Sequence, residues 1–245
     1  MLVELYLFLV FILAGVVQTA TGFGYALVAA PLLALALDIK DAVMLTTITS
    51  IISMLFLLRS IKNQGTYSEA VPLVASSLIG AVFGAYIMFA INDDWLKIFL
   101  AVMLILISCA MWMGYSPPVK HNKFMEYIVG TVNGFLGATT SIIGPIIALY
   151  YLNASDNKAV FRGILTRYFL MIYPLIIIVW GLQGTLHIRS LWVFTVEAVP
   201  ALYIGFLVGE KLFYRIEAET FRKIALMIVL IGSLMLIRSV LSKYF

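Results

Sequence analysis

The sequence predicts an all-α integral membrane protein of two homologous halves, each a broken, re-entrant helical hairpin followed by three transmembrane helices. The chain is 63% hydrophobic and only 11% charged, whereas roughly a quarter of the residues in a soluble domain are charged. Apolar runs of about 17 residues or more, enough to cross the hydrocarbon core, recur along the whole chain. Two of these runs, in corresponding positions of the two halves, are interrupted by glycine, proline and hydroxyl residues.

Short polar links separate the apolar runs and leave no length for a soluble domain. We expect eight segments, at residues 4–37, 42–58, 68–91, 96–114, 127–152, 160–181, 190–209 and 221–241. The widest link, residues 115–123, contains adjacent prolines and lysines and lies near the middle of the chain. It divides one membrane domain into two repeats, residues 1–115 and residues 116–245.

The two halves align element by element, as the internal repeats of many transporters do. Gly15 aligns with Gly130, Asp41 with Asp156, Gly80-x-x-x-Gly84 with Gly205-x-x-x-Gly209, and Lys97 with Arg222. Two small residues four apart on one helix face allow two helices to approach closely, so the glycine pairs predict helix packing and no substrate contact.

The first segment is too long for one ordinary span. As a single helix, residues 4–37 would measure roughly 50 Å, against a hydrocarbon core of about 30 Å. Either this helix is strongly tilted, or the segment is a re-entrant hairpin of two half-helices of about 24 Å each, turning at residues 21–24. Residues 127–152, its counterpart, are shorter and fit either alternative.

The distribution of lysine and arginine favours the hairpins, because cytoplasmic links carry an excess of basic residues. If every segment crosses once, the two faces receive seven and eight basic residues. If both broken segments are hairpins, ten share one face: Arg59, Lys62, Lys120, Lys123, Lys158, Arg162, Lys211, Arg215, Arg222 and Lys223. The other five are Lys40, Lys97, Arg189, Arg238 and Lys243. The ten-to-five distribution of basic residues depends on the second broken segment being a hairpin. Repeat symmetry then extends the hairpin prediction to the first broken segment.

This topology predicts that the ten-residue face is cytoplasmic and that the C-terminus lies outside the cytoplasm. A hairpin plus three spans is an odd number of crossings, so the two halves have opposite orientations in the membrane. In such inverted repeats the substrate site lies at the repeat interface near the bilayer midplane.

The broken segments predict an anion site, because the N-terminus of a half-helix presents unpaired N–H groups and the positive end of the helix dipole. The candidate residues are Gln18, Thr19, Thr21, Gly22, Gly24 and Tyr25 in the first half, and Asn133, Gly137, Thr139, Thr140, Ser141, Gly144 and Pro145 in the second. The alternative is that glycine and proline only kink the helices while the hydroxyls satisfy the freed carbonyls.

Ionisable residues inside a membrane segment are costly and suggest function. Arg162 and Arg167 open the sixth segment and are candidates to bind the anion, although snorkelling to the headgroups is the alternative, above all for Arg162. Glu197 lies well inside the seventh segment, where it is a candidate to couple transport to protons or to pair with Arg167. Glu210 lies near a segment end, and we expect it to be solvated.

Several functions are disfavoured by what the sequence lacks. It contains no G-x-x-x-x-G-K-[ST] phosphate loop, which disfavours ATP-driven pumping. No nucleophile, base and orienting group share one depth, and no metal ligands cluster, so we expect neither an enzyme nor a cofactor. The net charge of +4 suits anionic lipid headgroups and gives no reason to expect nucleic acid. The expected partners are a small anion and the lipid bilayer; coupling to protons or another ion and the oligomeric state stay open.

The motifs resemble those of the sulfite exporter TauE/SafE family of membrane permeases, over essentially the whole chain. The resemblance rests on GFGYALVAAPLL at residues 22–33, on Gly130-x-x-x-Gly134-x-x-Gly137 leading to Gly144-Pro145, and on KAVFRG at residues 158–163. It implies transport of small sulfur-containing anions, such as sulfite, sulfonates or sulfoacetate, across the bacterial inner membrane. Carried onto this chain, it implies a site that involves Gly22, Gly24, Pro31, Gly137, Gly144, Pro145 and Arg162.

The chain departs from this family where glycine is common, with Tyr25 and Ala26 in the first motif and Ser141 and Ile143 in the second. We expect Tyr25 and Ser141 to influence which anion fits. An anion channel is the alternative within transport. A membrane scaffold or sensor that transports nothing is the alternative from another class.

Overall fold

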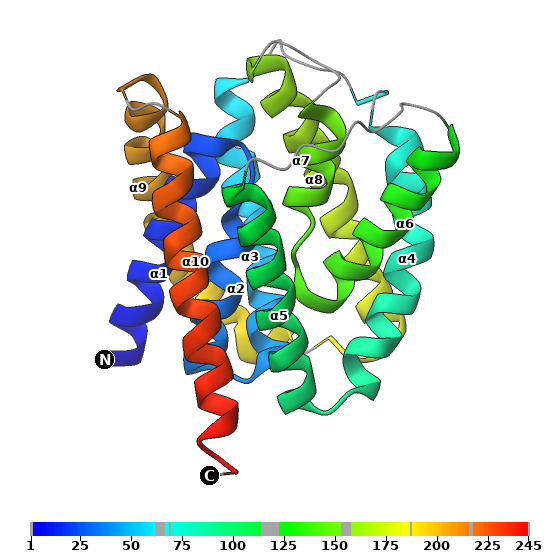
Figure 1. The fold of residues 1–245 in the computed structure, drawn as a ribbon, viewed down its shortest axis with the longest axis vertical. Helices are drawn as coiled ribbons and strands as arrows, with labels where there is room; N and C mark the ends of the chain where they lie inside the picture. Colours follow the sequence, from blue (N-terminus) through cyan, green and yellow to red (C-terminus); the bar gives the residue numbers. More distant parts are fainter. Residues whose placement is uncertain are drawn as a thin grey trace.

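The structure is a computed structural model that describes residues 2–61, 67–68, 70–113, 123–152, 158–186, 188–215 and 218–244. Within those ranges the regular structure consists of ten helices and no strands, which confirms the all-α prediction (Figure 1). They are α1 (Leu2–Thr21), α2 (Tyr25–Ala36), α3 (Ile39–Ser60), α4 (Val71–Ala90), α5 (Asp93–Trp112), α6 (Lys123–Thr140), α7 (Gly144–Leu152), α8 (Lys158–Leu182), α9 (Ile188–Arg215) and α10 (Ala218–Leu241).

Seven of these helices are long and apolar enough to cross a membrane: α1, α3, α4, α5, α8, α9 and α10. The chain is therefore a multi-pass membrane protein. The other three, α2, α6 and α7, all belong to the two segments that the sequence marks as broken. Both segments are indeed interrupted, between α1 and α2 and between α6 and α7.

The first broken segment turns where glycine allows it. Gly22 has a φ of +83° and Gly24 a φ of +105°, conformations that cost other L-residues about 1–2 kcal/mol. The turn lies at the predicted residues, but the prediction of two half-helices of about 24 Å each was wrong, because α1 begins at Leu2 and α2 ends at Ala36. The 20 residues of α1 span about 30 Å and the 12 residues of α2 about 18 Å.

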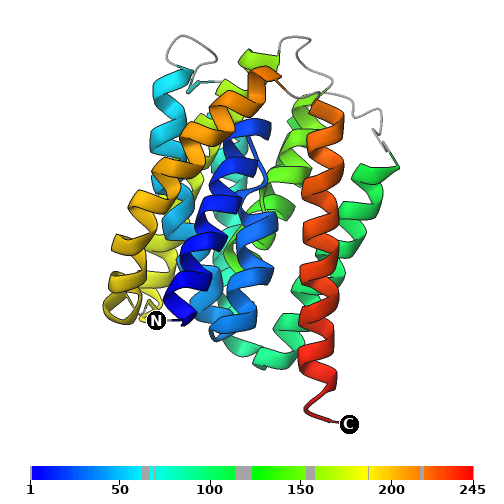
Figure 2. The same ribbon diagram turned by 90° about the vertical axis from the view of Figure 1, so that its left-hand side faces the viewer.

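The two hairpins reach into the helix bundle from opposite ends. Figures 1 and 2 show both chain termini at one end, which we call the terminal end; α1 rises from it and α2 returns to it. From the opposite end, which we call the basic end, α6 descends and α7 returns. The chain thus takes the hairpin alternative rather than the tilted single helix.

This topology distributes the basic residues as the hairpin alternative requires. The helix ends at the basic end carry Arg59, Lys123, Lys158, Arg162, Lys211, Arg215, Arg222 and Lys223. The terminal end holds Lys40, Lys97, Arg189, Arg238 and Lys243. Lys62 and Lys120, which we expect on the first face, and Asp156 of the repeat alignment lie outside the described residues.

The glycine pairs bring helices of different halves into backbone contact. A Cβ atom on Gly80 of α4 would lie 1.8 Å from the carbonyl oxygen of Thr131 of α6, and one on Gly134 of α6 would lie 1.8 Å from that of Ser77. In the same way, a Cβ on Gly205 of α9 would lie 3.1 Å from the Cα of Gly15 of α1. The first helix of each hairpin therefore packs on the glycine-pair helix of the other half.

Candidate anion site between the two turns

The turns of the two hairpins meet inside the bundle. A Cβ atom on Gly144, the first residue of α7, would lie 3.1 Å from the Cβ of Phe23 and 3.6 Å from the backbone nitrogen of Gly24. Gly24 is the N-cap of α2. The N-termini of two short helices from different halves of the chain are thus placed against one another.

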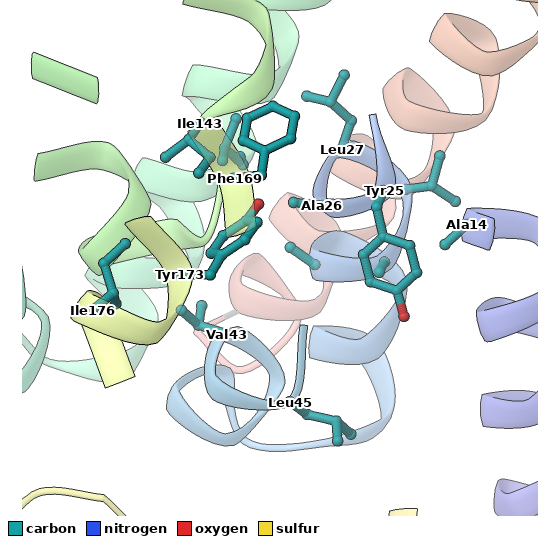
Figure 3. Packing of buried hydrophobic residues seen from close by; sticks show 14 of the residues in the cluster. Ala14, Tyr25, Ala26, Leu27, Val43, Leu45, Ile143, Phe169, Tyr173 and Ile176 are labelled. Carbon is teal, nitrogen blue, oxygen red and sulfur yellow. The ribbon is translucent and has the colours of Figure 1, made fainter. Parts of the chain in front are cut away.

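A small cavity of about 10 Å³ lies where the turns meet, the volume of about one water molecule. Its lining is Gln18, Gly24, Tyr25, Ala26, Leu27, Met54, Ile142, Gly144, Pro145, Phe169 and Tyr173, none of which is charged. In Figure 3 the rings of Tyr173 and Tyr25 lie on opposite sides of Ala26. Sulfite, with one sulfur and three oxygen atoms, does not fit into this volume.

Gln18 holds the first turn together from inside α1. Its side-chain Oε1 accepts a hydrogen bond from the backbone N–H of Tyr25 at 3.0 Å, and its Nε2 donates to the carbonyl oxygen of Gly22 at 3.0 Å. Thr21 supports the same turn by accepting a hydrogen bond from the backbone N–H of Phe23 at 3.3 Å. The neutral oxygen of Gln18 therefore occupies the N-terminus of α2, which is the position that attracts an anion.

Ser141 forms the second turn in the left-handed conformation, with a φ of +64°. This conformation explains physically why glycine suits the position. The carbonyl oxygen of Ser141 accepts a hydrogen bond from the Tyr173 hydroxyl at 3.1 Å, and its Oγ accepts one from Thr47 at 3.0 Å. Thr140 accepts a hydrogen bond from the backbone N–H of Ile142 at 3.3 Å. The second turn is thus tied to α3 and α8.

Three other candidates on α6 serve the packing of that helix. Asn133 donates from Nδ2 to the Tyr168 hydroxyl at 2.8 Å. Thr139 donates to carbonyl oxygens of α6 and α4, at 2.6 Å to that of Phe135 and 3.3 Å to that of Gly84. A Cβ on Gly137 would lie 2.3 Å from the Cγ2 of Ile143. None of these three residues lines the cavity, and a role in binding stays a prediction for them. Thr19 is also absent from the lining, and its Cβ faces Gly209 of α9.

Arg162 lies directly behind the first turn, at the basic end. A Cβ atom on Gly22 would lie 2.9 Å from the Cγ of Arg162, so the turn packs on the arginine stem. Arg162 is only 4% exposed and pairs with Glu210 of α9, whose side chain is 22% exposed, so Glu210 is only partly solvated. Burial excludes the snorkelling alternative for Arg162.

The two remaining ionisable candidates lie apart from the cavity. Arg167 is buried, donates to the carbonyl oxygen of Gly163 at 3.1 Å, and places its guanidinium 5.4 Å from the ring centroid of Tyr67. Glu197 is half-buried and lines an open groove of about 370 Å³ with Glu4 of α1. Whether Glu197 couples transport to protons stays a prediction.

Reasoning from the sequence missed Met54 and Phe169 as lining residues and Thr47 as a support of the second turn. The sequence feature that could have indicated a role for α3 is a run rich in hydroxyl residues, at 46–50 and Ser53. Its hydroxyl side chains are buried within an otherwise apolar helix. These hydroxyls turn back onto carbonyl oxygens of α3, as that of Ser50 does to Thr46 at 2.7 Å. Nothing local in the sequence marks Met54 or Phe169, because each is an ordinary apolar residue of a membrane helix.

Comparison with known proteins adds the family. The model of the family described as sulfite exporter TauE/SafE matches residues 7–236, from α1 to α10. Neither the curated proteins nor the solved structures give a match to this chain. The family match covers both hairpins, the cavity lining and Arg162. The chain therefore belongs to the sulfite exporter TauE/SafE family of membrane transporters.

Proposed function

We propose that the chain is a secondary transporter of small sulfur-containing anions, such as sulfite, sulfonates or sulfoacetate, which bind between the two turns. The observation that carries this proposal is the meeting of the N-termini of α2 and α7 at a cavity whose lining has no charged side chain. The N–H groups in the first turn of a helix have no partner within the helix. Two such ends attract an anion through neutral groups, and they also let it leave.

The lengths of the short helices support a site near the bilayer midplane. From the turns, the 12 residues of α2 reach about 18 Å toward the terminal end, and the 9 residues of α7 about 14 Å toward the basic end. A hydrocarbon core is about 30 Å thick. The N-termini that meet at the turns therefore lie inside the core, and we propose that the site lies near its midplane.

We infer that the two halves, residues 1–115 and 116–245, form inverted repeats that rock around this site. The reciprocal packing supports the inference, because α1 packs on α9 while α6 packs on α4. Rocking of one repeat against the other gives access from each side in turn. A rocking transporter has a closed state between the two, which is how we interpret a cavity with room for about one water molecule.

We further propose that the protein resides in the bacterial inner membrane, with the basic end in the cytoplasm and the C-terminus outside. The excess of lysine and arginine at the basic end supports this orientation. The same proposal makes the chain a transporter and not an enzyme.

Flux measurements on the purified protein in liposomes test the proposed function. Counterflow of sulfite, sulfoacetate, taurine and sulfate is measured against protein-free vesicles. We expect saturable exchange of at least one of the sulfur-containing anions. A current that does not saturate indicates a channel instead, and the absence of flux for every anion contradicts transport.

Substitutions at Gln18 connect this flux to the N-terminus of α2. Gln18→Glu places a carboxylate where the amide oxygen accepts from Tyr25, so we expect it to compete with the substrate anion and to abolish counterflow. Gln18→Ala removes the same hydrogen bond without adding charge, and we expect it to reduce counterflow by about tenfold, the effect of about 1.4 kcal/mol. Equal counterflow in the two variants would show that no anion binds at this helix end.

A further inference from the structure

Arg162 and Glu210 form a buried ion pair beside the first turn. Arg162 donates from Nη2 to Oε1 of Glu210, and the same nitrogen donates to the Ser60 hydroxyl of α3 at 2.8 Å. The guanidinium carbon lies 4.6 Å from the ring centroid of Phe213. Only 5% of the Arg162 side chain and 22% of the Glu210 side chain are exposed. One guanidinium thus connects α8, α9, α3 and the turn at Gly22.

The pair leaves part of the arginine unused. Its Nε is buried and has no hydrogen-bond partner among the described residues. A guanidinium presents Nε and the terminal nitrogens as a fork that suits an oxyanion with two oxygens. The contact that Glu210 supplies through one oxygen is therefore of the kind that a carboxylate, sulfonate or sulfite supplies.

We propose that Glu210 is an internal competitor for Arg162, and that the transported anion takes its place only when Glu210 is protonated. One proton is then bound with each anion. The inference rests on the proposed function and adds to it the ion that drives transport. It also assigns proton coupling to Glu210 in place of Glu197.

Charge balance at the buried pair is the reason for this linkage. With Glu210 ionised the pair is neutral, and a bound anion would leave a net negative charge in a site from which water is largely excluded. Such uncompensated buried charge is strongly unfavourable. Protonation of Glu210 restores neutrality, because the anion then pairs with Arg162. The proton comes from the solution at the basic end, where Glu210 is partly exposed, and it returns there when the anion leaves and the pair reforms.

Glu210 is the carboxylate that contacts Arg162. On α3, α8 and α9, which carry Ser60, Arg162 and Glu210, the other charged groups described near this end are basic: Arg59, Lys158, Arg167, Lys211 and Arg215. Glu219 on α10 and Glu126 on α6 are carboxylates at the same end. The turn at residues 21–24 carries no charged residue. An anion that reaches Arg162 therefore competes with the carboxylate of Glu210.

Proton uptake on binding tests the proposal with the wild-type protein. Methanesulfonate and sulfate serve as probes because each keeps its charge between about pH 5.5 and about pH 8. In lightly buffered detergent solution, we expect about one proton taken up per methanesulfonate bound, because its single charge then pairs with Arg162, and affinity for both anions that weakens as the pH rises. Binding without proton uptake overturns the inference and leaves the proposed function intact. If neither anion binds nor exchanges, the proposed function fails and the inference fails with it.

Glu210→Gln fixes the position in its neutral form. In liposomes we expect this variant to keep counterflow of methanesulfonate, to lose accumulation driven by a pH gradient, and to bind at about pH 8 at least about tenfold more tightly than the wild type. Glu126→Gln removes a carboxylate from the same end, on α6, and is expected to behave like the wild type. Glu197→Gln distinguishes the two coupling candidates. If Glu197→Gln loses accumulation driven by the pH gradient while Glu210→Gln keeps it, the proposal is contradicted.

Discussion

Gly22→Ala is expected to lower both stability and transport. A residue other than glycine at a φ of +83° costs about 1–2 kcal/mol. The new methyl group would also lie 2.9 Å from the Cγ of Arg162, whose guanidinium is held by Glu210 and Ser60 and cannot move aside freely. We expect a lower unfolding temperature in detergent and a counterflow rate reduced by about tenfold, the effect of a further 1.4 kcal/mol or so on anion binding.

Gly184→Ala is the matched control for this prediction. Gly184 has a φ of +67°, and a Cβ atom there would meet nothing within 4 Å. The substitution Gly184→Ala therefore introduces similar backbone strain, but away from Arg162. We expect a comparable loss of stability from strain alone, with counterflow like that of the wild type. Equal counterflow in Gly22→Ala and Gly184→Ala would mean that the contact between Gly22 and Arg162 is unimportant for transport.

Gly80→Ala is expected to separate α4 from α6 and to have the largest effect on folding. Its Cβ would lie 1.8 Å from the carbonyl oxygen of Thr131 and 2.8 Å from the backbone nitrogen of Phe135, and backbone atoms cannot rotate away. Overpacking typically costs about 1–3 kcal/mol, and a clash with backbone belongs at the upper end. Because α6 carries the second turn, we expect a lower unfolding temperature, less monodisperse protein and loss of counterflow.

Gly181→Ala tests whether this effect comes from the helix contact. A Cβ atom on Gly181 would lie 3.9 Å from Leu186, an ordinary distance, so the same substitution meets no obstacle there. Alanine also favours a helix by about 1 kcal/mol relative to glycine. We expect no loss of stability in Gly181→Ala, and a wild-type unfolding temperature in Gly80→Ala would contradict the packing that the structure describes.

The sequence carries enough information to locate the helices and the two turns. Apolar run lengths report the spans because the bilayer core has a fixed thickness. Gly22 and Gly24 mark the first turn because their backbone conformations suit glycine, and α7 begins at Gly144-Pro145. Proline at the first positions of a helix lacks an N–H that would in any case have no helical partner. Local residue chemistry decides these features, so they can be predicted.

The lining of the site and the ion pair depend on lateral packing, which local sequence does not encode. Asn133 is absent from the cavity lining, because the rotation of α6 turns its Nδ2 toward Tyr168, and its role in binding stays a prediction. Glu210 was expected to be solvated because it lies near the end of α9. Its partner Arg162 lies 48 residues away in the sequence, and Phe213, on the next turn of α9, covers the guanidinium. Burial in a bundle comes from neighbouring helices, so distance from a helix end does not predict it.

We propose that the two turns enclose the anion and must part for it to move. A disulfide between Phe23→Cys and Gly144→Cys tests this claim, because a Cβ on Gly144 would lie 3.1 Å from that of Phe23, close to the usual disulfide spacing of about 3.5–4.5 Å. The exposed Cys109 is replaced by serine, and each single cysteine variant serves as a control for oxidation.

The decisive measurement is counterflow of methanesulfonate by the double-cysteine protein before oxidation, after oxidation and after reduction, with the cross-linked fraction determined by mass spectrometry. A sulfonate is used because sulfite itself cleaves disulfides. We predict that oxidation forms the cross-link and stops counterflow, that reduction restores it, and that the single-cysteine controls are unaffected. Counterflow at the wild-type rate in fully cross-linked protein would show that the anion moves without parting of the two turns.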